Sequence, residues 1–215
     1  MDKNYPLRTV SFLERETDCV IASPAITDPD GLNGKKIGLL RASSLDVLLT
    51  DQLQRHSFAV SRKYFRTPNE MIAALRHGDV DAITLYVPLA QKLEPDFKVL
   101  HWFGTDHPRH PCCNIVVNTA LMDLNKTSLI REICNALERS VASIGGRDRD
   151  LLAFMMRRYG LTETQALQSL EHTHFIMGLD DEGKHFEAQM AKLMADSGYL
   201  SQQISPNKIY WEPWE

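Results

Sequence analysis

The chain has 215 residues, of which 43% are hydrophobic and 24% charged, and its formal net charge at pH 7 is −4. This composition is typical of a globular protein with a buried core and excludes a largely disordered chain. The acidic balance gives no support to a nucleic-acid partner, which favours a basic face. No apolar run reaches the ~18 residues that a membrane helix needs.

The first ten residues, MDKNYPLRTV, contain no apolar segment of the kind that a secretory signal requires. We therefore expect no signal peptide in this chain, as for a cytosolic protein or for a processed or truncated form. Four cysteines, Cys19, Cys112, Cys113 and Cys134, match neither a disulfide framework nor a zinc-binding spacing. No cofactor is expected.

Strand-like and helix-like segments alternate in the first half of the chain. Short β-branched segments with polar flanks predict strands, and apolar residues at helical spacing predict the helices between them. The expected strands are 8–13, 18–26, 35–40, 58–65, 80–86 and 97–103, and the expected helices are 43–56, 67–78 and a short one after Pro88. From residue 35 onwards this alternation predicts a mostly parallel sheet covered by helices.

The second half has a different character. A loop at 104–114, GTDHPRHPCCN, precedes one more expected strand at 115–118. Helical periodicity then covers 127–143, 148–159, 162–171 and 180–197, with glycines between the helices. We predict an α/β half followed by a helical half, with the boundary near residues 118–126.

Ala42, Ser43 and Ser44 follow the strand at 35–40 and open the next helix. Ser43 can cap that helix, which is a common use of serine. The first N–H groups of a helix have no intrahelical partner, the helix dipole is positive there, and small residues let an anion approach. Because open α/β sheets tend to bind ligands at this end of the strands, we interpret the three residues as a candidate anion site that is compatible with capping.

The segment DHPRHPCC contains four residue types that can bind zinc: His107, His110, Cys112 and Cys113. Adjacent cysteines fit poorly on one tetrahedral ion, and no second cluster completes the site. We expect a surface loop here, which could still place His110 at the mouth of a cleft. His172 and His174 would face different sides of a helix, so no metal site is expected there either.

Two stretches resemble the substrate-binding proteins of the nitrate, sulfonate and taurine ABC importers and the related thiamine-precursor group. They are GLNGKKIGLL, which a small residue, two serines and a helix follow, and PNEMIAALRHGDVDAITLYVP. The shared parts are an L-x-G-K-K-I-G entry, the serine-opened helix, an A-L-x-x-G-x-V-D-A unit, and an aromatic residue followed one position later by proline. The order of elements fits from about residue 10 to residue 200.

The resemblance implies a type II periplasmic-binding-protein-like α/β fold, in which two lobes hold a ligand between them. It implies a remnant of the first lobe and a crossover at 1–31, the second lobe at 32–103, and a crossover strand with C-terminal helices at 104–215. Only RTVSFL, CVIAS and NIVVN are then left to form the sheet of a truncated first lobe. Such a sheet would expose apolar surface, so we expect a homodimer or a missing-lobe partner.

The resemblance also implies a ligand site. Tyr86 would face the cleft ahead of Pro88, although a tyrosine packed in the core fits the sequence as well. Ala42 stands where the family often has glycine. The candidate ligand-binding residues are therefore Ala42, Ser43, Ser44, Tyr86, Pro88 and His110.

The resemblance favours a solute-binding protein that delivers a small anionic or zwitterionic ligand, such as an oxyanion or a sulfonate, to an importer permease. This function implies a periplasmic location and no reaction chemistry. One alternative is a ligand-sensing or partner-binding domain derived from such a protein. A second is an enzyme on the same fold, such as a thiamine-pyrimidine synthase or a desulfinase. The sequence shows no nucleophile–base pair, so we expect a protein that is not an enzyme.

Overall fold

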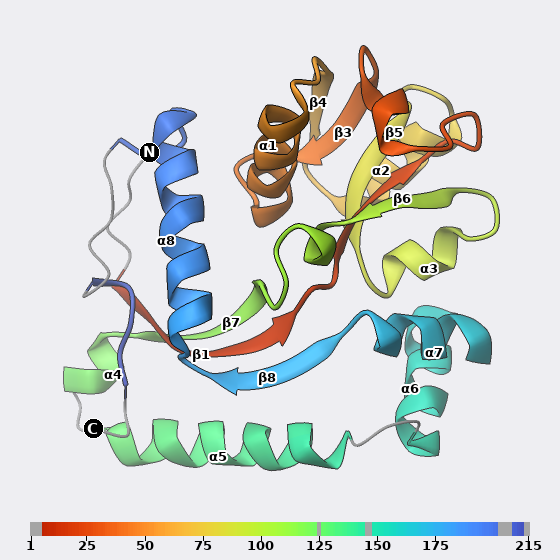
Figure 1. Cartoon of the computed structure of the whole chain (residues 1–215). Helices are drawn as coiled ribbons and strands as arrows, with labels where there is room; N and C mark the ends of the chain where they lie inside the picture. Colours follow the sequence, from red (N-terminus) through yellow and green to blue (C-terminus); the bar gives the residue numbers. More distant parts are fainter. Residues whose placement is uncertain (1–5, 124–125, 145–147, 202–207, 213–215) are drawn as a thin grey trace.

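The computed structural model describes residues 6–123, 126–144, 148–201 and 208–212. These residues form two β-sheets with helices around them (Figure 1). The larger sheet has five strands in the order β4-β3-β5-β2-β6, and the smaller sheet has three in the order β7-β1-β8. The predicted α/β class is therefore confirmed.

The larger sheet is mostly parallel, as the sequence predicts. β3 pairs parallel with β4 and β5, whereas β2 pairs antiparallel with β5 and β6. β2 is thus the one strand of this sheet that runs against the others. The strands are β2 (Asp18–Ala22), β3 (Lys36–Leu40), β4 (Ser61–Phe65), β5 (Ala82–Tyr86) and β6 (Lys98–Trp102), and the helices between them are α1 (Ser44–His56), α2 (Pro68–Arg76) and α3 (Leu89–Leu93), with short 3-10 helices at Pro29–Leu32 and Phe103–Thr105.

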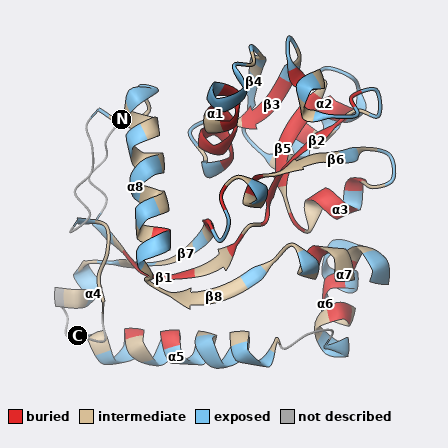
Figure 2. Cartoon of the chain, in the orientation of Figure 1, coloured by how far each residue is buried: buried red, intermediate tan, exposed pale blue. Residues whose placement is uncertain are grey.

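Helices cover both faces of this sheet, because successive side chains of a strand point to opposite sides. Val20 and Ala22 of β2 pack in one apolar cluster with the leucines of α1. Cys19 and Ile21 of the same strand pack in a second cluster with apolar residues of α2 and α3. Figure 2 shows that buried residues concentrate in this part of the molecule, which holds most of the core.

The smaller sheet is antiparallel and has β1 at its centre. β1 (Leu7–Arg15) pairs with β7 (Pro111–Asn118) on one side and with β8 (His174–Gly178) on the other. The segment 208–212 lies beside the start of β1, where the Thr9 N–H donates to the carbonyl of Ile209 and the Trp211 N–H donates to the carbonyl of Thr9.

The helices of the second half surround the smaller sheet. They are α4 (Ala120–Asp123), α5 (Thr127–Ser143), α6 (Arg149–Tyr159), α7 (Glu163–Glu171) and α8 (Asp181–Asp196). In Figure 1, α5 runs along the smaller sheet and α8 extends from that sheet to contact α1. In the part of the chain that the structure describes, no helix combines the length and the apolar character needed to cross a membrane.

The chain crosses between the two sheets twice. β1 leads into β2 through Glu16 and Thr17, and β6 leads back to β7 through residues 103–110. The crossings lie side by side, because the Glu16 N–H donates to the carbonyl of His110 at 3.2 Å. The two sheets therefore meet at this point, and the candidate site lies there.

Three sequence predictions differ from the structure. The CVIAS segment, expected in the smaller sheet, is β2 of the larger sheet. β8 was not expected, because only two residues separate α7 from this five-residue strand, which shows no separate pattern. His174 lies in this strand, whereas His172 follows the end of α7. Cys112 and Cys113, expected in a loop, lie in β7, because pairing with β1 extends that strand back to Pro111.

Candidate ligand-binding site

A pocket of about 520 Å³ lies where the two crossings meet the larger sheet. Leu40 and Tyr86, the last residues of β3 and β5, form part of its wall, so the pocket lies at the carboxyl end of these parallel strands. Its lining mixes hydroxyl, carboxyl, thiol and apolar side chains: Glu14, Thr17, Asp18, Leu40, Ser43, Ser44, Leu45, Tyr86, Val87, Pro88, Leu89, Cys112, Cys113 and Tyr159.

Four of the predicted site residues share this pocket: Ser43, Ser44, Tyr86 and Pro88. Ser43 and Tyr86 therefore face the same space, which the site hypothesis required. Ala42 and His110 are not among the lining residues. His110 is 1% exposed and lies behind the pocket wall, rather than at a cleft mouth. The ligand-binding roles of all six residues remain predictions.

Ser43 acts as the helix cap that the sequence predicts. Its hydroxyl accepts from the Asp46 N–H at 3.3 Å and donates to the carbonyl of Leu40 at 2.7 Å. Ala42 has a positive φ of 54°, which explains why glycine is common at this position in the resembling family.

The start of α1 already holds a carboxylate of the chain itself. The fully buried Asp46 accepts from the Ala42 N–H at 2.9 Å and pairs with Arg62 Nη1 at 3.0 Å. Its negative charge sits where the positive end of the helix dipole would attract an anion. The Asp46 carboxylate thus occupies part of the candidate anion site.

A β-bulge turns two thiols toward the pocket. Glu14 of β1 pairs with Cys113, and Arg15 pairs with Pro111, which leaves Cys112 as the extra residue of β7. Two residues opposite one partner define a bulge, and bulges redirect side chains. Cys112 and Cys113 therefore both line the pocket, although neighbours in a regular strand would point apart.

Each of these thiols lies beside a carboxylate. Cys112 Sγ donates to Asp18 Oδ1 at 3.4 Å and accepts from Thr17 Oγ1 at 3.0 Å. Burial raises the pKa of Glu14, a hydrogen bond from Cys113 opposes that rise, and the charge of Asp18 raises the pKa further. Sequence reasoning missed both carboxylates; the only local signal was the acidic ERETD segment at the end of β1.

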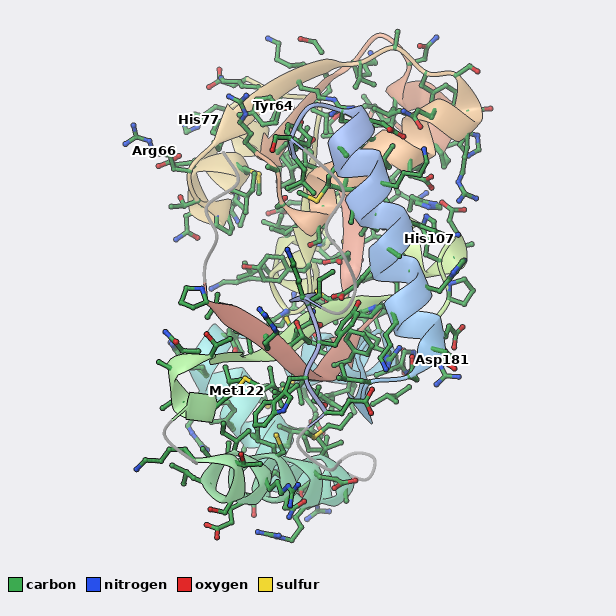
Figure 3. All side chains as sticks on the ribbon, turned by 90° about the vertical axis from the view of Figure 1, so that its left-hand side faces the viewer. Tyr64, Arg66, His77, His107, Met122 and Asp181 are labelled. Atoms are coloured by element: carbon green, nitrogen blue, oxygen red, sulfur yellow. The ribbon has the colours of Figure 1, made fainter. Side chains whose placement is uncertain are left out.

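Two histidines support the wall behind Asp18. His110 Nδ1 donates to the carbonyl of His107 at 2.8 Å, and its Nε2 lies 3.5 Å from Asp18 Oδ2. His107 Nε2 lies 2.8 Å from Asp51 Oδ2 of α1, and its ring meets the Phe186 ring of α8 edge to face, with the centroids 5.4 Å apart. Figure 3 shows His107 beside α8. These contacts join the return crossing to α1 and α8. No group of three or more His, Cys, Asp or Glu residues suited to a metal ion occurs in the described ranges.

No protein-family model and no curated protein matches this sequence. Solved structures match the fold. The periplasmic aliphatic sulphonate binding protein SsuA from Escherichia coli aligns over 97% of this chain and 74% of its own, at 18% identity and a TM-score of 0.81. The alkanesulfonate-binding protein SsuA from Xanthomonas axonopodis pv. citri, bound to MOPS, aligns over 96% and 74%, at 17% identity and a TM-score of 0.82. The fold is that of the periplasmic solute-binding proteins.

The periplasmic-binding-protein fold serves more than one purpose among the matched structures. The ligand-binding component of an ABC-type import system from Staphylococcus aureus aligns over 97% of this chain and 73% of its own, at 14% identity and a TM-score of 0.82. The desulfurization enzyme DSZB aligns over 96% and 77%, at 13% identity and a TM-score of 0.69. Because one fold supports both binding and catalysis, function has to be argued from the site.

Proposed function

We propose that this chain is a solute-binding module of an ABC importer, which takes a small zwitterionic or anionic organic molecule into the pocket and presents it to a permease. The observation that carries the proposal is the pocket of about 520 Å³ at the carboxyl ends of β3 and β5. Open α/β sheets bind ligands at this end, and ligand pockets combine apolar walls with a few orienting polar groups. The hydroxyls of Ser44 and Tyr86 supply such groups. A periplasmic location belongs to the same proposal.

The buried thiol of Cys112 favours binding over catalysis. A hydrogen bond with Cys113, together with burial, raises the pKa of Cys112 far above its ordinary value. A thiol that stays protonated is a poor nucleophile. Cys112 therefore gives no support to a desulfinase-like or thiamine-pyrimidine-synthase-like reaction, and we propose a protein that is not an enzyme.

A thermal-shift screen tests the proposed function. Sulfonates, nitrate, bicarbonate, amino acids and thiamine precursors cover the relevant ligand classes. A ligand present at 100 times its Kd adds about 2.7 kcal/mol to the free energy of unfolding, so a true ligand raises Tm by several degrees. Ser44→Phe, which fills the pocket, should abolish the shift, whereas Thr164→Phe at an exposed position of α7 should preserve it. A flat response to every class would contradict the proposal.

The proposal also includes a partner that binds at the smaller sheet. Such a partner is the feature that favours the alternative of a ligand-sensing or partner-binding domain. Among the described residues, β7 pairs only with β1, so its other edge is open. We propose that a second copy of the chain, or a segment equivalent to the additional part of the longer matched structures, pairs with this edge.

A further inference from the structure

The pocket is lined by carboxyl groups and by no basic side chain among its described residues. Asp18 and Glu14 both line it, and none of its described lining residues is Lys, Arg or His. Asp46 adds another carboxylate at the start of α1, although Arg62 neutralises it. Several of the matched structures are sulfonate-binding proteins, whereas the charges of this pocket alone would not select a sulfonate.

Asp18 is a buried carboxylate that lacks a full set of partners. The residue is 1% exposed, and its Oδ2 makes no hydrogen bond within the described part of the chain. His110 Nε2 is 3.5 Å from this atom but does not reach hydrogen-bond geometry, so the two atoms are both left without a hydrogen bond. Oδ1 receives only the weak thiol donor of Cys112. Buried carboxylates are normally paired or fully hydrogen-bonded, because desolvating a charge is costly.

Glu14 faces the same space from the neighbouring strand. Its pKa is raised mainly by burial, and the negative charge of Asp18 adds to the effect. Cys113 is the thiol donor beside it. Two carboxylates that repel each other and receive only weak donors form a site that a cation would stabilise.

We propose that Asp18 and Glu14 bind the ammonium group of a small amine or amino-zwitterion. A primary ammonium has three donors and no acceptor, so it can hydrogen-bond to two carboxylates at once. Tyr86 and Tyr159 line the same pocket, and an aromatic ring attracts a cation that lies over its face. The inference rests on the proposed function and specifies its ligand. The protein recognises the ammonium group of the ligand, and the ligand needs no anionic group.

Two pairs of ligands that differ only in the cationic group test the inference. Taurine and isethionate both carry a sulfonate, but taurine has an ammonium group where isethionate has a hydroxyl. Tyramine and tyrosol both carry a phenol, and tyramine has an ammonium group where tyrosol has a hydroxyl. Calorimetry at pH 7.5 should give the ammonium ligand of each pair a Kd at least about tenfold lower than that of the hydroxyl ligand. The reason is that hydrogen bonds between an ammonium and a carboxylate are stronger than those of a neutral hydroxyl. Asp18→Asn or Glu14→Gln should remove most of this preference. Asp96→Asn, an equal charge change at an exposed position, should leave it intact.

A second measurement needs no ligand. If Asp18 is held in the pocket for a cation, Asp18→Asn removes an uncompensated charge and should raise the Tm of the unliganded chain. If Asp18 instead serves mainly as an ion-pair partner of His110, the same substitution should lower Tm, which would overturn the inference.

The failure of the inference and that of the proposed function can be told apart. Tighter binding of isethionate than of taurine, or a preference that survives both neutral variants, would reject the ammonium site and leave a solute-binding protein for anions. A lower Tm in Asp18→Asn rejects the site in the same way. Absence of a thermal shift in the whole ligand screen rejects the proposed function itself.

Discussion

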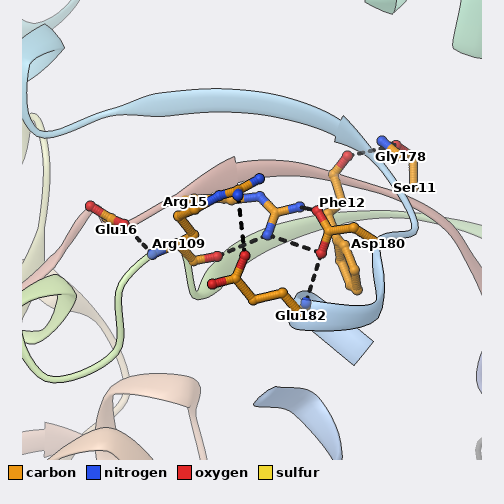
Figure 4. A network of polar contacts seen from close by, with 9 residues as sticks. Ser11, Phe12, Arg15, Glu16, Arg109, Gly178, Asp180 and Glu182 are labelled. Carbon is orange, nitrogen blue, oxygen red and sulfur yellow. Dashed lines mark hydrogen bonds and ion pairs between the residues drawn. The ribbon is translucent and has the colours of Figure 1, made fainter. Parts of the chain in front are cut away.

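Arg15, at the end of β1, has a fully buried side chain. Its Nη2 donates to Asp180 Oδ2 at 2.5 Å, and its Nη1 donates to the carbonyl of Arg109 at 2.8 Å (Figure 4). Arg109 also pairs with Glu182 at 3.2 Å. The Arg15 guanidinium thereby joins the first strand, the return crossing and the start of α8.

Removing the charge of Asp180 should destabilise the protein markedly. Asp180→Asn keeps an oxygen that can cap α8 but leaves the Arg15 cation buried without its counter-ion, a change that costs several kcal/mol when both partners are buried. Because about a third of the Asp180 side chain is exposed, we expect a loss of about 2–3 kcal/mol in the free energy of unfolding. Urea denaturation measures it. Glu182→Gln, which disrupts the exposed pair, should cost below about 1 kcal/mol; equal losses would contradict the argument.

The sequence predicted those residues whose partners are close along the chain. Ser43 caps through Asp46, only three residues away, and serine at that position is a local signal. Arg15 and Asp180 are 165 residues apart, and Asp18 and Cys112 are 94 apart. No local pattern reveals such pairs. Ser43 could therefore be predicted from a local pattern, and Tyr86 and Pro88 from the resemblance to a known family, whereas the carboxylates and thiols of the pocket could not.

At the scale of elements, helices were predicted more accurately than strands. Helix starts carry local caps, and the side chains that cap these helices accept hydrogen bonds from the first turn: Ser43, Thr67, Asp148, Thr162 and Asp180. A strand depends on a partner elsewhere in the chain, so neither β8 nor the assignment of β2 to the larger sheet could be obtained from local patterns.

The contact of α8 with β1 depends on a glycine. A Cβ at Gly183 would overlap the ring of Phe12. This ring is fully buried, and Tyr210 and the Arg15 guanidinium also pack against it, so it has little room to move. α8 can approach β1 this closely only because residue 183 lacks a side chain.

Gly183→Ala should therefore destabilise the chain, although glycine to alanine in a helix normally adds up to about 1 kcal/mol. Overpacking of a core costs about 1–3 kcal/mol, so we expect a net loss in the free energy of unfolding. Thermal and urea denaturation measure it. Phe12→Leu shortens the opposing side chain. Gly183→Ala should therefore cost less free energy of unfolding in a Phe12→Leu background than in the unmodified chain. A stabilised Gly183→Ala protein would show that the helix moves away without cost.

At the scale of the whole molecule, the two sheets differ in how they protect their edges. β4, at one edge of the larger sheet, carries Arg62 and Lys63, and charged residues discourage pairing with another chain. β7 has no charged residue from Pro111 to Asn118, and Val116 is 50% exposed. Its open edge is therefore suited to pairing with a further strand.

Apolar side chains are also exposed on helices of the second half. Ile130 and Cys134 of α5 are buried, but Leu129 and Ile133 of the same helix are 46% and 48% exposed. Phe154 of α6 is 50% exposed. The sequence predicted that the small sheet would leave apolar surface uncovered, and these three side chains are exposed. Which partner covers them stays a prediction.

We expect the chain to self-associate through β7 and the exposed side of α5. Two antiparallel copies of β7 can complete each other's hydrogen bonds, and burial of the exposed apolar side chains would add to the stability of the dimer. Light scattering at about 50 µM, within the usual range for weak dimers, should report a mass above that of the monomer. Val116→Lys and Ile133→Lys should restore the monomer, since each places a charge in the interface. Ser61→Lys, on the charged edge strand β4, should not change the mass. A monomer that also fails to bind an apolar dye would contradict the proposed interface, because it would mean that the helices already cover the apolar residues of the smaller sheet.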